Sequence, residues 1–276
     1  MSEDGVFNGK VWWITGASSG IGAALAVAMT KAGAGVILSG RNVAGLEAVA
    51  ARCGTATILP FEATDHAALP GAVERAFAWR GRVDGLVNNA GISQRSFAAE
   101  TPFNVYEKII AVDLLAPIAL TQLVLPRMIA AGGGWIVAVA SVAGLFGPPL
   151  RSAYAAAKFG LVGYCDSVRA ETAHQGVRVL LVAPGSTRTD VSRNALDATG
   201  KARGKSDPVI DNGMDPAMVA DQMLAALRAG RRELIVAEGM EAEAVRLRRA
   251  DPDALFDMTA AMVAAGYAKQ LGVQET

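Results

Sequence analysis

Three side chains between positions 135 and 160 have the types and spacing needed to move a proton: Ser141, Tyr154 and Lys158. An apolar run of strand length leads to Ser141, and an Ala-rich helical run begins near Ser152. Tyr154 and Lys158 are four residues apart, so in a helix they share one face. A phenol alone titrates near pH ~10, and a nearby ammonium favours its phenolate form. The pattern predicts Tyr154 as a general acid or base, although a surface helix can carry this spacing by chance.

A second candidate site is the glycine-rich turn from Thr15 to Gly22. A short apolar run at 10–16 precedes it and a helical run follows. Glycine lets the backbone approach a ligand closely, and the free N–H groups that open a helix attract phosphate. The turn therefore predicts a nucleotide pyrophosphate site. Its GxxxGxG spacing differs from the commonest dinucleotide fingerprint, and no Gly-Lys-Ser/Thr follows as in a P-loop.

The same turn contains an alternative, because Gly16 to Gly20 fits the G-x-S-x-G pattern of a hydrolase nucleophile. The hydrolase fold needs strands and an oxyanion-hole loop before that pattern. Only fifteen residues precede Gly16, so the hydrolase reading is disfavoured.

The end of the next apolar run, 35–40, bears on the choice of cofactor. In a strand-helix-strand unit this position faces the adenosine ribose, where an acid binds the 2′-hydroxyl and an arginine accepts a 2′-phosphate. Positions 38–40 hold no acid and Arg41 follows at once, which favours NADP over NAD. The alternative is that Arg41 is a solvated surface residue.

Strands and helices alternate through the rest of the chain. We expect helices at 43–53, from after Asp65 to about Arg80, at 102–128 with an interruption at Pro117, from about 152, at 215–228 and from 240 onward. We expect further strands at 55–61, 85–91, after 135, 177–185 and 233–237. This alternation indicates an α/β fold, a mostly parallel sheet of about seven strands with helices on both faces, in a single domain over 1–276. The polar, Gly-rich stretch at about 186–214 reads as a lid over the substrate, and about 240–272 as a helical tail.

Composition excludes several classes of partner. Lys+Arg and Asp+Glu number 26 each, so no net charge favours nucleic acid or an anionic membrane. Two cysteines and two histidines give neither a disulfide framework nor a zinc site. The N-terminus is polar and acidic, and the apolar runs are interrupted before ~18 residues, so we expect a cytoplasmic protein without a membrane span.

Five motifs in order make the chain resemble the short-chain dehydrogenase/reductase family over roughly residues 8–190. They are TGASSGIG (15–22), NNAG (88–91), Ser141, YAAAK (154–158) and PGST (184–187). LSGRN, RSAYAAAKFGL and GYCDSVRAE look most like the NADP-dependent carbonyl reductases of the DHRS7-like branch. The resemblance implies a Rossmann-like, doubly wound fold and an NADP-dependent oxidoreductase that interconverts a ketone or aldehyde and an alcohol by hydride transfer.

The resemblance also implies roles for single residues. Tyr154 exchanges the proton, Ser141 hydrogen-bonds the reacting oxygen, Lys158 holds the nicotinamide ribose, and Asp113 takes the place of a fourth catalytic residue. The residues implied to contact the cofactor are Gly16, Ser18, Ser19, Gly20, Ile21, Arg41, Glu62, Asn89, Ala90, Gly91, Tyr154, Lys158, Pro184, Gly185 and Thr187.

Three departures from the family pattern matter. Asp113 aligns with an asparagine of the family, and its charge can pair with Lys158 and blunt the effect of Lys158 on Tyr154. Glu62 replaces an aspartate, and the tail lacks the usual Asp-Gly-Gly ending. Asp113 motivates an alternative function, a catalytically weak NADP-binding sensor or regulatory protein.

The sequence says less about substrate and assembly. Ile92, Leu145, Phe146 and Leu150 lie near the motifs and suggest an apolar pocket for a lipophilic carbonyl or alcohol, or else are core residues under the lid. A homodimer or homotetramer is expected from the resemblance alone.

Overall fold

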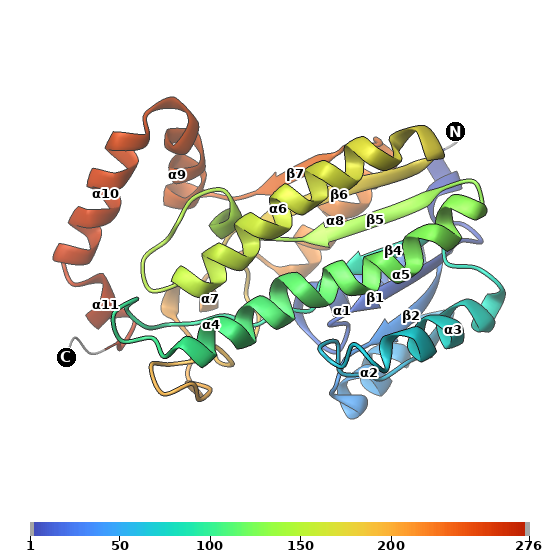
Figure 1. The fold of residues 1–276 in the computed structure, drawn as a ribbon, viewed down its shortest axis with the longest axis horizontal. Coiled ribbons are helices and arrows are strands. Elements are labelled where there is room, and N and C mark those ends of the chain that lie inside the picture. The colour runs from blue at the N-terminus through green and yellow to red at the C-terminus, as the bar shows by residue number, and fades with distance from the viewer. Residues whose placement is uncertain (1–2, 274–276) are drawn as a thin grey trace.

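The computed structural model describes residues 3–273, and its centre is a parallel sheet of seven strands (Figure 1). The strand order is β3-β2-β1-β4-β5-β6-β7. The strands are β1 (Val11–Thr15), β2 (Gly35–Ser39), β3 (Ala56–Ile58), β4 (Gly85–Asn88), β5 (Gly134–Val139), β6 (Val177–Pro184) and β7 (Glu233–Val236). This confirms the expected doubly wound, Rossmann-like sheet in a single domain.

The order of the strands reverses at β1, which positions the site. The chain runs outward from β1 through β2 to β3 and then returns to place β4 on the other side of β1, with Ile14 opposite Val87. Ligands of such sheets bind in the crevice beyond the carboxyl ends of the strands at this reversal. The glycine-rich turn follows β1, and the NNAG motif begins at the end of β4.

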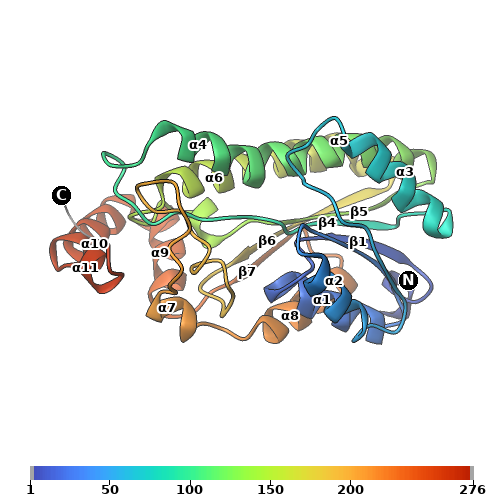
Figure 2. The ribbon, with the colours of Figure 1, turned by 90° about the horizontal axis from the view of Figure 1, so that it is seen from below.

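Two layers of helices cover the sheet because its strands are buried on both faces (Figure 2). Trp12 and Ile14 point toward one layer, and Val11 and Trp13 point toward the other. The first layer holds α1 (Gly20–Lys31), α2 (Val43–Ala50) and α8 (Pro216–Arg228). The second holds α3 (Leu69–Arg80), α4 (Phe103–Ile110), α5 (Ala116–Ala130) and α6 (Ser152–Thr172).

The expected interruption at Pro117 is wrong, because Phe103–Ala130 is one helix of 28 residues. A π turn, η2 (Ala111–Leu115), joins α4 to α5, and Pro117 falls in the first turn of α5 just after it. The wider π turn accommodates the missing proline N–H without breaking the helix. By length and composition alone this helix is apolar enough to cross a membrane. Here Leu120, Val124 and Met128 pack on the sheet.

The remaining differences from the expected elements are at their ends. β3 ends at Ile58, because Pro60 has no N–H to continue the ladder. α2 ends at Ala50, and α3 begins only at Leu69.

The polar segment at 186–214 and the tail are folded back onto the strand ends. α7 (Pro208–Asp211) is the helix of the segment, and α9 (Gly239–Ala250), α10 (Pro252–Ala264) and α11 (Tyr267–Gln270) make up the tail at one end of the molecule (Figure 1). Short 3-10 turns complete the structure: η1 (Glu3–Val6), η3 (Val142–Gly144) and η4 (Ala173–Gln175).

Candidate active site

The turn between β1 and α1 is a cradle that only glycine fits. Gly16 and Gly20 have positive φ angles, of 64° and 55°. A Cβ on Gly16 would lie 2.8 Å from the Ala90 Cα, and one on Gly22 would lie 2.4 Å from the Gly16 carbonyl oxygen. Ser19, the N-cap of α1, places no side-chain oxygen on the first N–H groups of the helix. These open N–H groups and the close backbone approach fit a pyrophosphate.

Asn89 braces this turn from β4. Its side-chain amide donates to the carbonyl oxygens of Thr15 (3.0 Å) and Gly16 (3.1 Å). The Thr15 hydroxyl accepts from the N–H groups of Asn89 (3.0 Å) and Ala90 (3.1 Å) and donates to the Val87 carbonyl. The Asn89 side chain therefore positions the backbone of the turn.

Tyr154 and Lys158 lie in the first two turns of α6, as the sequence predicts. The Lys158 ammonium is 5.5 Å from the centre of the Tyr154 ring and donates to the Val139 carbonyl at the end of β5 (3.2 Å). It also pairs with Asp113 of η2, with 3.1 Å between Nζ and Oδ2. The second oxygen of Asp113 accepts from the Ile92 N–H at 2.8 Å. The expected pairing of Asp113 with Lys158 is therefore present.

Burial and mutual attraction compete in this pair, which is almost fully shielded from solvent. Burial raises the pKa of the Asp113 carboxyl above its ordinary value, and the Lys158 ammonium and the Ile92 N–H limit that rise. Burial also opposes the charge on Lys158, but the Asp113 carboxylate outweighs it, and the pKa of Lys158 lies above its ordinary value. Each group therefore favours the charged form of the other, while burial opposes both charges.

Position 91 is occupied by glycine, and a larger side chain there would be too close to this pair. A Cβ on Gly91 would lie 2.9 Å from the Asp113 Oδ2 and 3.5 Å from the Lys158 Nζ. Nearby, a small cleft is lined by Thr15, Ala63, Asn88, Ala90, Val112, Ala116, Pro117 and Leu120. The NNAG motif thus joins the glycine-rich turn to the Lys158 side of the site.

Ser141 caps the 3-10 turn η3 immediately after β5. Its hydroxyl accepts from the Ala143 N–H (3.1 Å) and lies 3.3 Å from the Pro184 carbonyl, to which it donates. Pro184 ends β6, and Gly185 continues the pairing by donating to Val236 (2.8 Å). Thr187 follows, and its hydroxyl donates a hydrogen bond to the Gly185 carbonyl (3.0 Å). The carboxyl ends of β1, β4, β5 and β6 therefore bring the predicted residues to one edge of the sheet.

Arg41 lies beyond the end of β2, exposed over 70% of its side chain. Its guanidinium pairs with Glu62 at 3.4 Å, and Glu62 also accepts from the N–H and hydroxyl of Thr64. Ser39, the last residue of β2, is buried and accepts from the Trp13 indole N–H. No carboxylate of β2 faces this position, since the described residues of that strand carry none.

A cavity of about 640 Å³ opens beside the turn. Ser18, Ser19 and Gly20 line it together with Arg52, Arg188 and Arg193. Its lining holds neither Ser141 nor Tyr154 nor Lys158, so the cavity is not the place of the proton chemistry. It borders the open N-terminus of α1, and three aspartates in its lining balance the charge of its three arginines. Within residues 3–273, no three His, Cys, Asp or Glu side chains gather as metal ligands would.

A family model described as short chain dehydrogenase matches residues 10–200. The chain belongs to this family. A dehydrogenase/reductase SDR family protein 7-like of Anopheles gambiae is 38% identical over 258 residues, which cover 90% of this chain and 81% of the relative. A short-chain dehydrogenase structure from Streptomyces avermitilis has a TM-score of 0.76 and 29% identity, covering 94% of this chain and 98% of its own. A metagenomic short-chain oxidoreductase in complex with NADP has a TM-score of 0.69 and 33% identity, covering 84% and 98%.

As a member of the short-chain dehydrogenase family, the chain is an oxidoreductase, and the glycine cradle suits the dinucleotide of a nicotinamide cofactor. The family resemblance predicted from five motifs is confirmed, including the relation to the SDR member 7 proteins.

The four residues expected near an apolar pocket lie in different surroundings. Phe146 packs with Leu255 of α10, and Leu150 with Leu271 beyond α11, so both are core residues beneath the tail. Ile92 packs in the cluster that includes Tyr154. Only Ile92 and the partly exposed Leu145 are left as candidates for an apolar lining.

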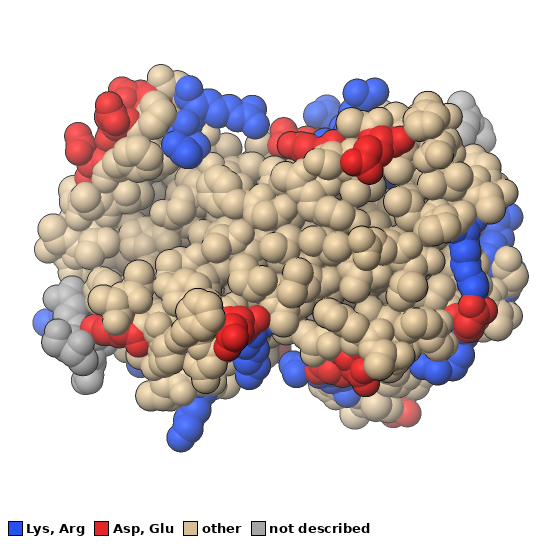
Figure 3. Space-filling model, viewed as in Figure 1, with Lys and Arg blue, Asp and Glu red and all other residues tan. Residues whose placement is uncertain are grey.

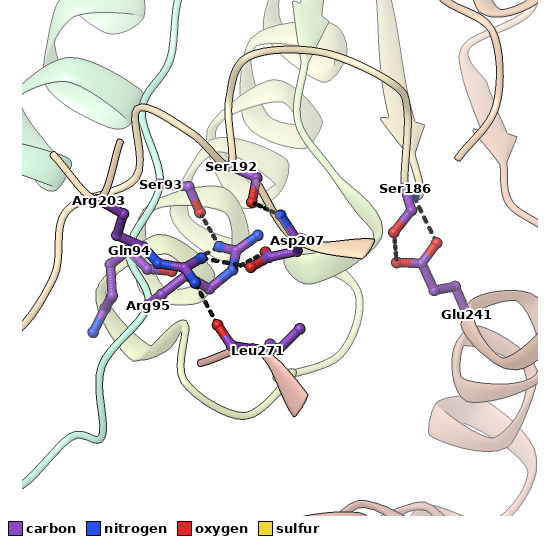
Figure 4. A network of polar contacts seen from close by, with 9 residues as sticks. All are labelled: Ser93, Gln94, Arg95, Ser186, Ser192, Arg203, Asp207, Glu241 and Leu271. Atoms are coloured by element: carbon purple, nitrogen blue, oxygen red, sulfur yellow. Dashed lines mark hydrogen bonds and ion pairs between the residues drawn. The ribbon is translucent and has the colours of Figure 1, made fainter. Parts of the chain in front are cut away.

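Sequence reasoning missed a polar network that links the segment 186–214, the loop after NNAG and the tail (Figure 4). Gln94 caps α6, accepting from the N–H groups of Ala153 (2.8 Å) and Tyr154 (3.4 Å). Asp207 pairs with Arg95 and Arg203, and Glu241 of α9 accepts from the N–H and hydroxyl of Ser186. Polar residues in loops carry no periodic signal, so only the folded chain reveals these partners.

Proposed function

We propose that this oxidoreductase is NADP-dependent and interconverts a ketone or aldehyde and the corresponding alcohol, with Tyr154 as general acid and base. The observation that carries the proposal is the buried Lys158 ammonium, 5.5 Å from the Tyr154 ring and next to the glycine cradle. A positive charge beside a phenol eases loss of its proton.

Each residue then has one task. The bound nicotinamide cofactor supplies the hydride that adds to the carbonyl carbon. Tyr154 donates its phenolic proton to the carbonyl oxygen, and in the reverse direction its phenolate accepts the alcohol proton. Ser141 turns its hydroxyl away from the Pro184 carbonyl to donate a hydrogen bond to the same oxygen. Lys158 holds the ribose hydroxyls through its ammonium, while Asp113 and the Val139 carbonyl fix the direction of that ammonium.

The preference for NADP rests on Arg41. A 2′-phosphate at the end of β2 would meet an exposed guanidinium whose present partner, Glu62, is itself 41% exposed. An exposed ion pair of this kind contributes about 0–1 kcal/mol, so a phosphate displaces Glu62 at little cost. After a phosphate has displaced it, the Glu62 carboxylate can still accept the hydrogen bond from the Thr64 N–H.

The pairing of Asp113 with Lys158 is the observation that favours the second candidate, a cofactor-binding sensor or regulatory protein. A carboxylate 3.1 Å from the ammonium cancels its charge and weakens the support for a phenolate. Ser141, Tyr154 and Lys158 are all present at the site, which favours the enzyme. Tight NADPH binding without turnover would favour the sensor.

The proposed assembly is a homodimer or homotetramer, supported by exposed apolar side chains on the outer face of α4, η2 and α6. For the substrate, Ile92 and Leu145 support a carbonyl compound with an apolar part.

The test is NADPH and NADH oxidation, side by side, over a panel of aliphatic, aromatic and steroid-like ketones and aldehydes. We expect turnover with NADPH and formation of the matching alcohol. If NADPH binds but no substrate is converted to an alcohol, the sensor function would be favoured over the proposed enzymatic function.

A further inference from the structure

Four charged side chains are buried together where the loop after NNAG meets the segment 186–214. Arg95, Arg151 and Asp207 are 3%, 8% and 0% exposed, and the Arg203 side chain is 4% exposed. Figure 4 shows Arg95 and Arg203 converging on Asp207 from different segments. Buried charges of this kind are costly unless each one has a partner.

Asp207 satisfies two of the three arginines. The Arg95 Nε donates to one carboxylate oxygen at 2.6 Å, and the Arg203 guanidinium donates to the other. Arg95 also donates to the Ser93 hydroxyl (2.8 Å) and the Gln94 carbonyl (2.7 Å), and Arg203 donates to the Leu271 carbonyl. Both oxygens of Asp207 are therefore in use.

Arg151 is the arginine that is left over. Its Nε and Nη2 are buried and have no hydrogen-bond partner, and it forms no ion pair with any residue in the described range 3–273. Its charge acts on its neighbour, because burial and the Arg151 guanidinium lower the pKa of Arg95 to about 10 against the pull of Asp207. Three guanidiniums and one carboxylate leave an excess of positive charge in this cluster.

The cluster lies at the start of the helix that carries the proposed proton donor. Arg151 is the N-cap residue of the 21-residue α6, and Tyr154 follows three residues later, one turn along the helix. Gln94, next to Arg95, accepts from the backbone N–H of Tyr154. The positive end of the α6 dipole adds to the charge at the same point.

We propose that Arg151 binds a carboxylate or phosphate group of the substrate whose carbonyl is reduced at Tyr154. The proposal rests on the proposed function and adds to it the class of substrate, a carbonyl compound that also carries an anion. A guanidinium matches either oxyanion with two parallel hydrogen bonds. A neutral analogue leaves Arg151 buried and unpaired, so the site discriminates against it strongly.

The first test compares matched substrates that differ only in charge. Keto acids of increasing chain length are paired with their methyl esters, and phosphate esters of hydroxy ketones are paired with the free hydroxy ketones. We expect kcat/KM to favour the anionic member of at least one series by about 100-fold. In Arg151→Gln this ratio should fall to near 1, chiefly through KM, while NADPH binding measured by fluorescence persists.

Arg178→Gln is the matched control. Arg178 is an exposed arginine of β6 at the opposite edge of the sheet, stacked on Trp135, and the ratio should stay at its original value in this variant. The series that shows the preference distinguishes a carboxylate from a phosphate. Turnover of charged and neutral members at equal kcat/KM overturns the proposal and leaves the proposed function intact. No turnover of any substrate overturns the proposed function itself.

Thermal unfolding separates a ligand-binding arginine from a structural one. Without any anion, Arg151→Met should raise the melting temperature by about 2–4 °C, since it removes an unpaired buried charge. Inorganic phosphate or glutarate should raise the melting temperature of the wild type and not that of the variant. A melting temperature lowered by Arg151→Met contradicts the proposal. If inorganic phosphate stabilises the wild type but anionic substrates are not preferred, the site binds only free anions and the proposal is overturned.

Discussion

At the scale of single residues, the chemistry depends on the buried pair of Lys158 and Asp113. The resemblance to the family aligns Asp113 with an uncharged asparagine, which would leave the Lys158 ammonium without a carboxylate partner. Here the Asp113 carboxyl lies 3.1 Å from that ammonium. We expect this pair to decide how strongly Lys158 acts on Tyr154.

Asp113→Asn tests this consequence directly. Removal of the carboxylate takes away the charge that raises the pKa of Lys158, so the pH profile of alcohol oxidation should shift. The measurement is kcat/KM for alcohol oxidation between pH 6 and pH 11. Asp190→Asn, an exposed aspartate, is the control and should leave the profile in place. A profile of Asp113→Asn that overlays the wild type contradicts this account of the pair.

Arg41→Ala tests the cofactor preference. Loss of one guanidinium from a phosphate contact should raise KM for NADPH about 10- to 100-fold and change KM for NADH little. Arg80→Ala, an exposed arginine stacked on Trp79, is the control. Equal KM changes for the two cofactors would mean that Arg41 does not contact the phosphate.

The residues found from the sequence are those whose partners are local. Tyr154 and Lys158 are one helical turn apart, and the glycine turn follows directly on a strand, so both were predicted. Thr15 and Gln94 act across 74 and 59 positions of the chain, on Asn89 and Ala153. No pattern in their own neighbourhood indicates such contacts, so these two positioning residues were missed.

At the scale of elements, the segment 186–214 was expected as a lid, and it is fastened at both ends. Thr187 pairs with Met214 in a short parallel bridge, and Leu196 pairs with Gln94. Asp207 ties the segment to the loop after NNAG, and Glu241 ties its start to α9. Any opening of this lid must therefore break buried ion pairs.

Asp207→Asn should release the segment. Breaking a buried ion pair on one side leaves Arg95 and Arg203 without a counter-charge and costs about 3–5 kcal/mol. The free energy of unfolding measures the cost, and trypsin should now cut at Arg193, Lys201 or Lys205. Asp190→Asn removes an exposed pair of the same segment, with Arg193, and should change stability by about 0.5 kcal/mol or less. Resistance of Asp207→Asn to trypsin would contradict the fastening role.

Acid should act through the same carboxyl. Burial opposes ionisation of Asp207, but Arg95 and hydrogen bonds from Arg203 and Ser192 outweigh it and hold the pKa of Asp207 below its ordinary value. A carboxyl with a lower pKa in the folded state stabilises fully above its unfolded value, about 3.9, and loses this contribution as the pH falls through its folded value. The wild type should therefore exceed Asp207→Asn in unfolding free energy by a constant margin above about pH 5. That margin should shrink below about pH 4. A margin that grows on acidification would contradict the assignment.

The helices and strands were predictable from the sequence, whereas the way in which they connect and dock was not. The strand-helix alternation gave seven strands in the right places, because apolar runs of strand length need burial on both faces. Pro117 was misread as a break because a π turn can absorb a proline, and nothing in the local composition announces one. The docking of the tail depends on Glu241 meeting Ser186 across 55 positions, which a family pattern with another ending does not predict.

At the scale of the whole molecule, one face suggests how copies assemble. Figure 3 shows that charged side chains lie mainly at the rim of the face on which α4, α5 and α6 run side by side. Leu115 is 44% exposed and Phe159 is 39% exposed on these helices. Apolar exposure of this kind is typical of an interaction surface.

We expect the particle mass in solution to be twice or four times 28.5 kDa, measured by light scattering after gel filtration. A Leu115→Glu and Phe159→Glu double variant should reduce it to 28.5 kDa by placing charge on this face. Met240→Glu, at an exposed apolar residue of α9 away from the face, is the control. A wild type that elutes as a monomer would contradict the expected assembly.

The central claim is that Tyr154 donates the proton in NADPH-dependent carbonyl reduction, and Tyr154→Phe tests it most directly. The measurement is NADPH oxidation by wild type and variant on the best ketone of the panel, with NADPH affinity determined in parallel by fluorescence. The account predicts that the variant binds NADPH as the wild type does and loses at least about 100-fold in kcat. A variant that retains wild-type kcat would contradict the account, because the proton would then come from another group.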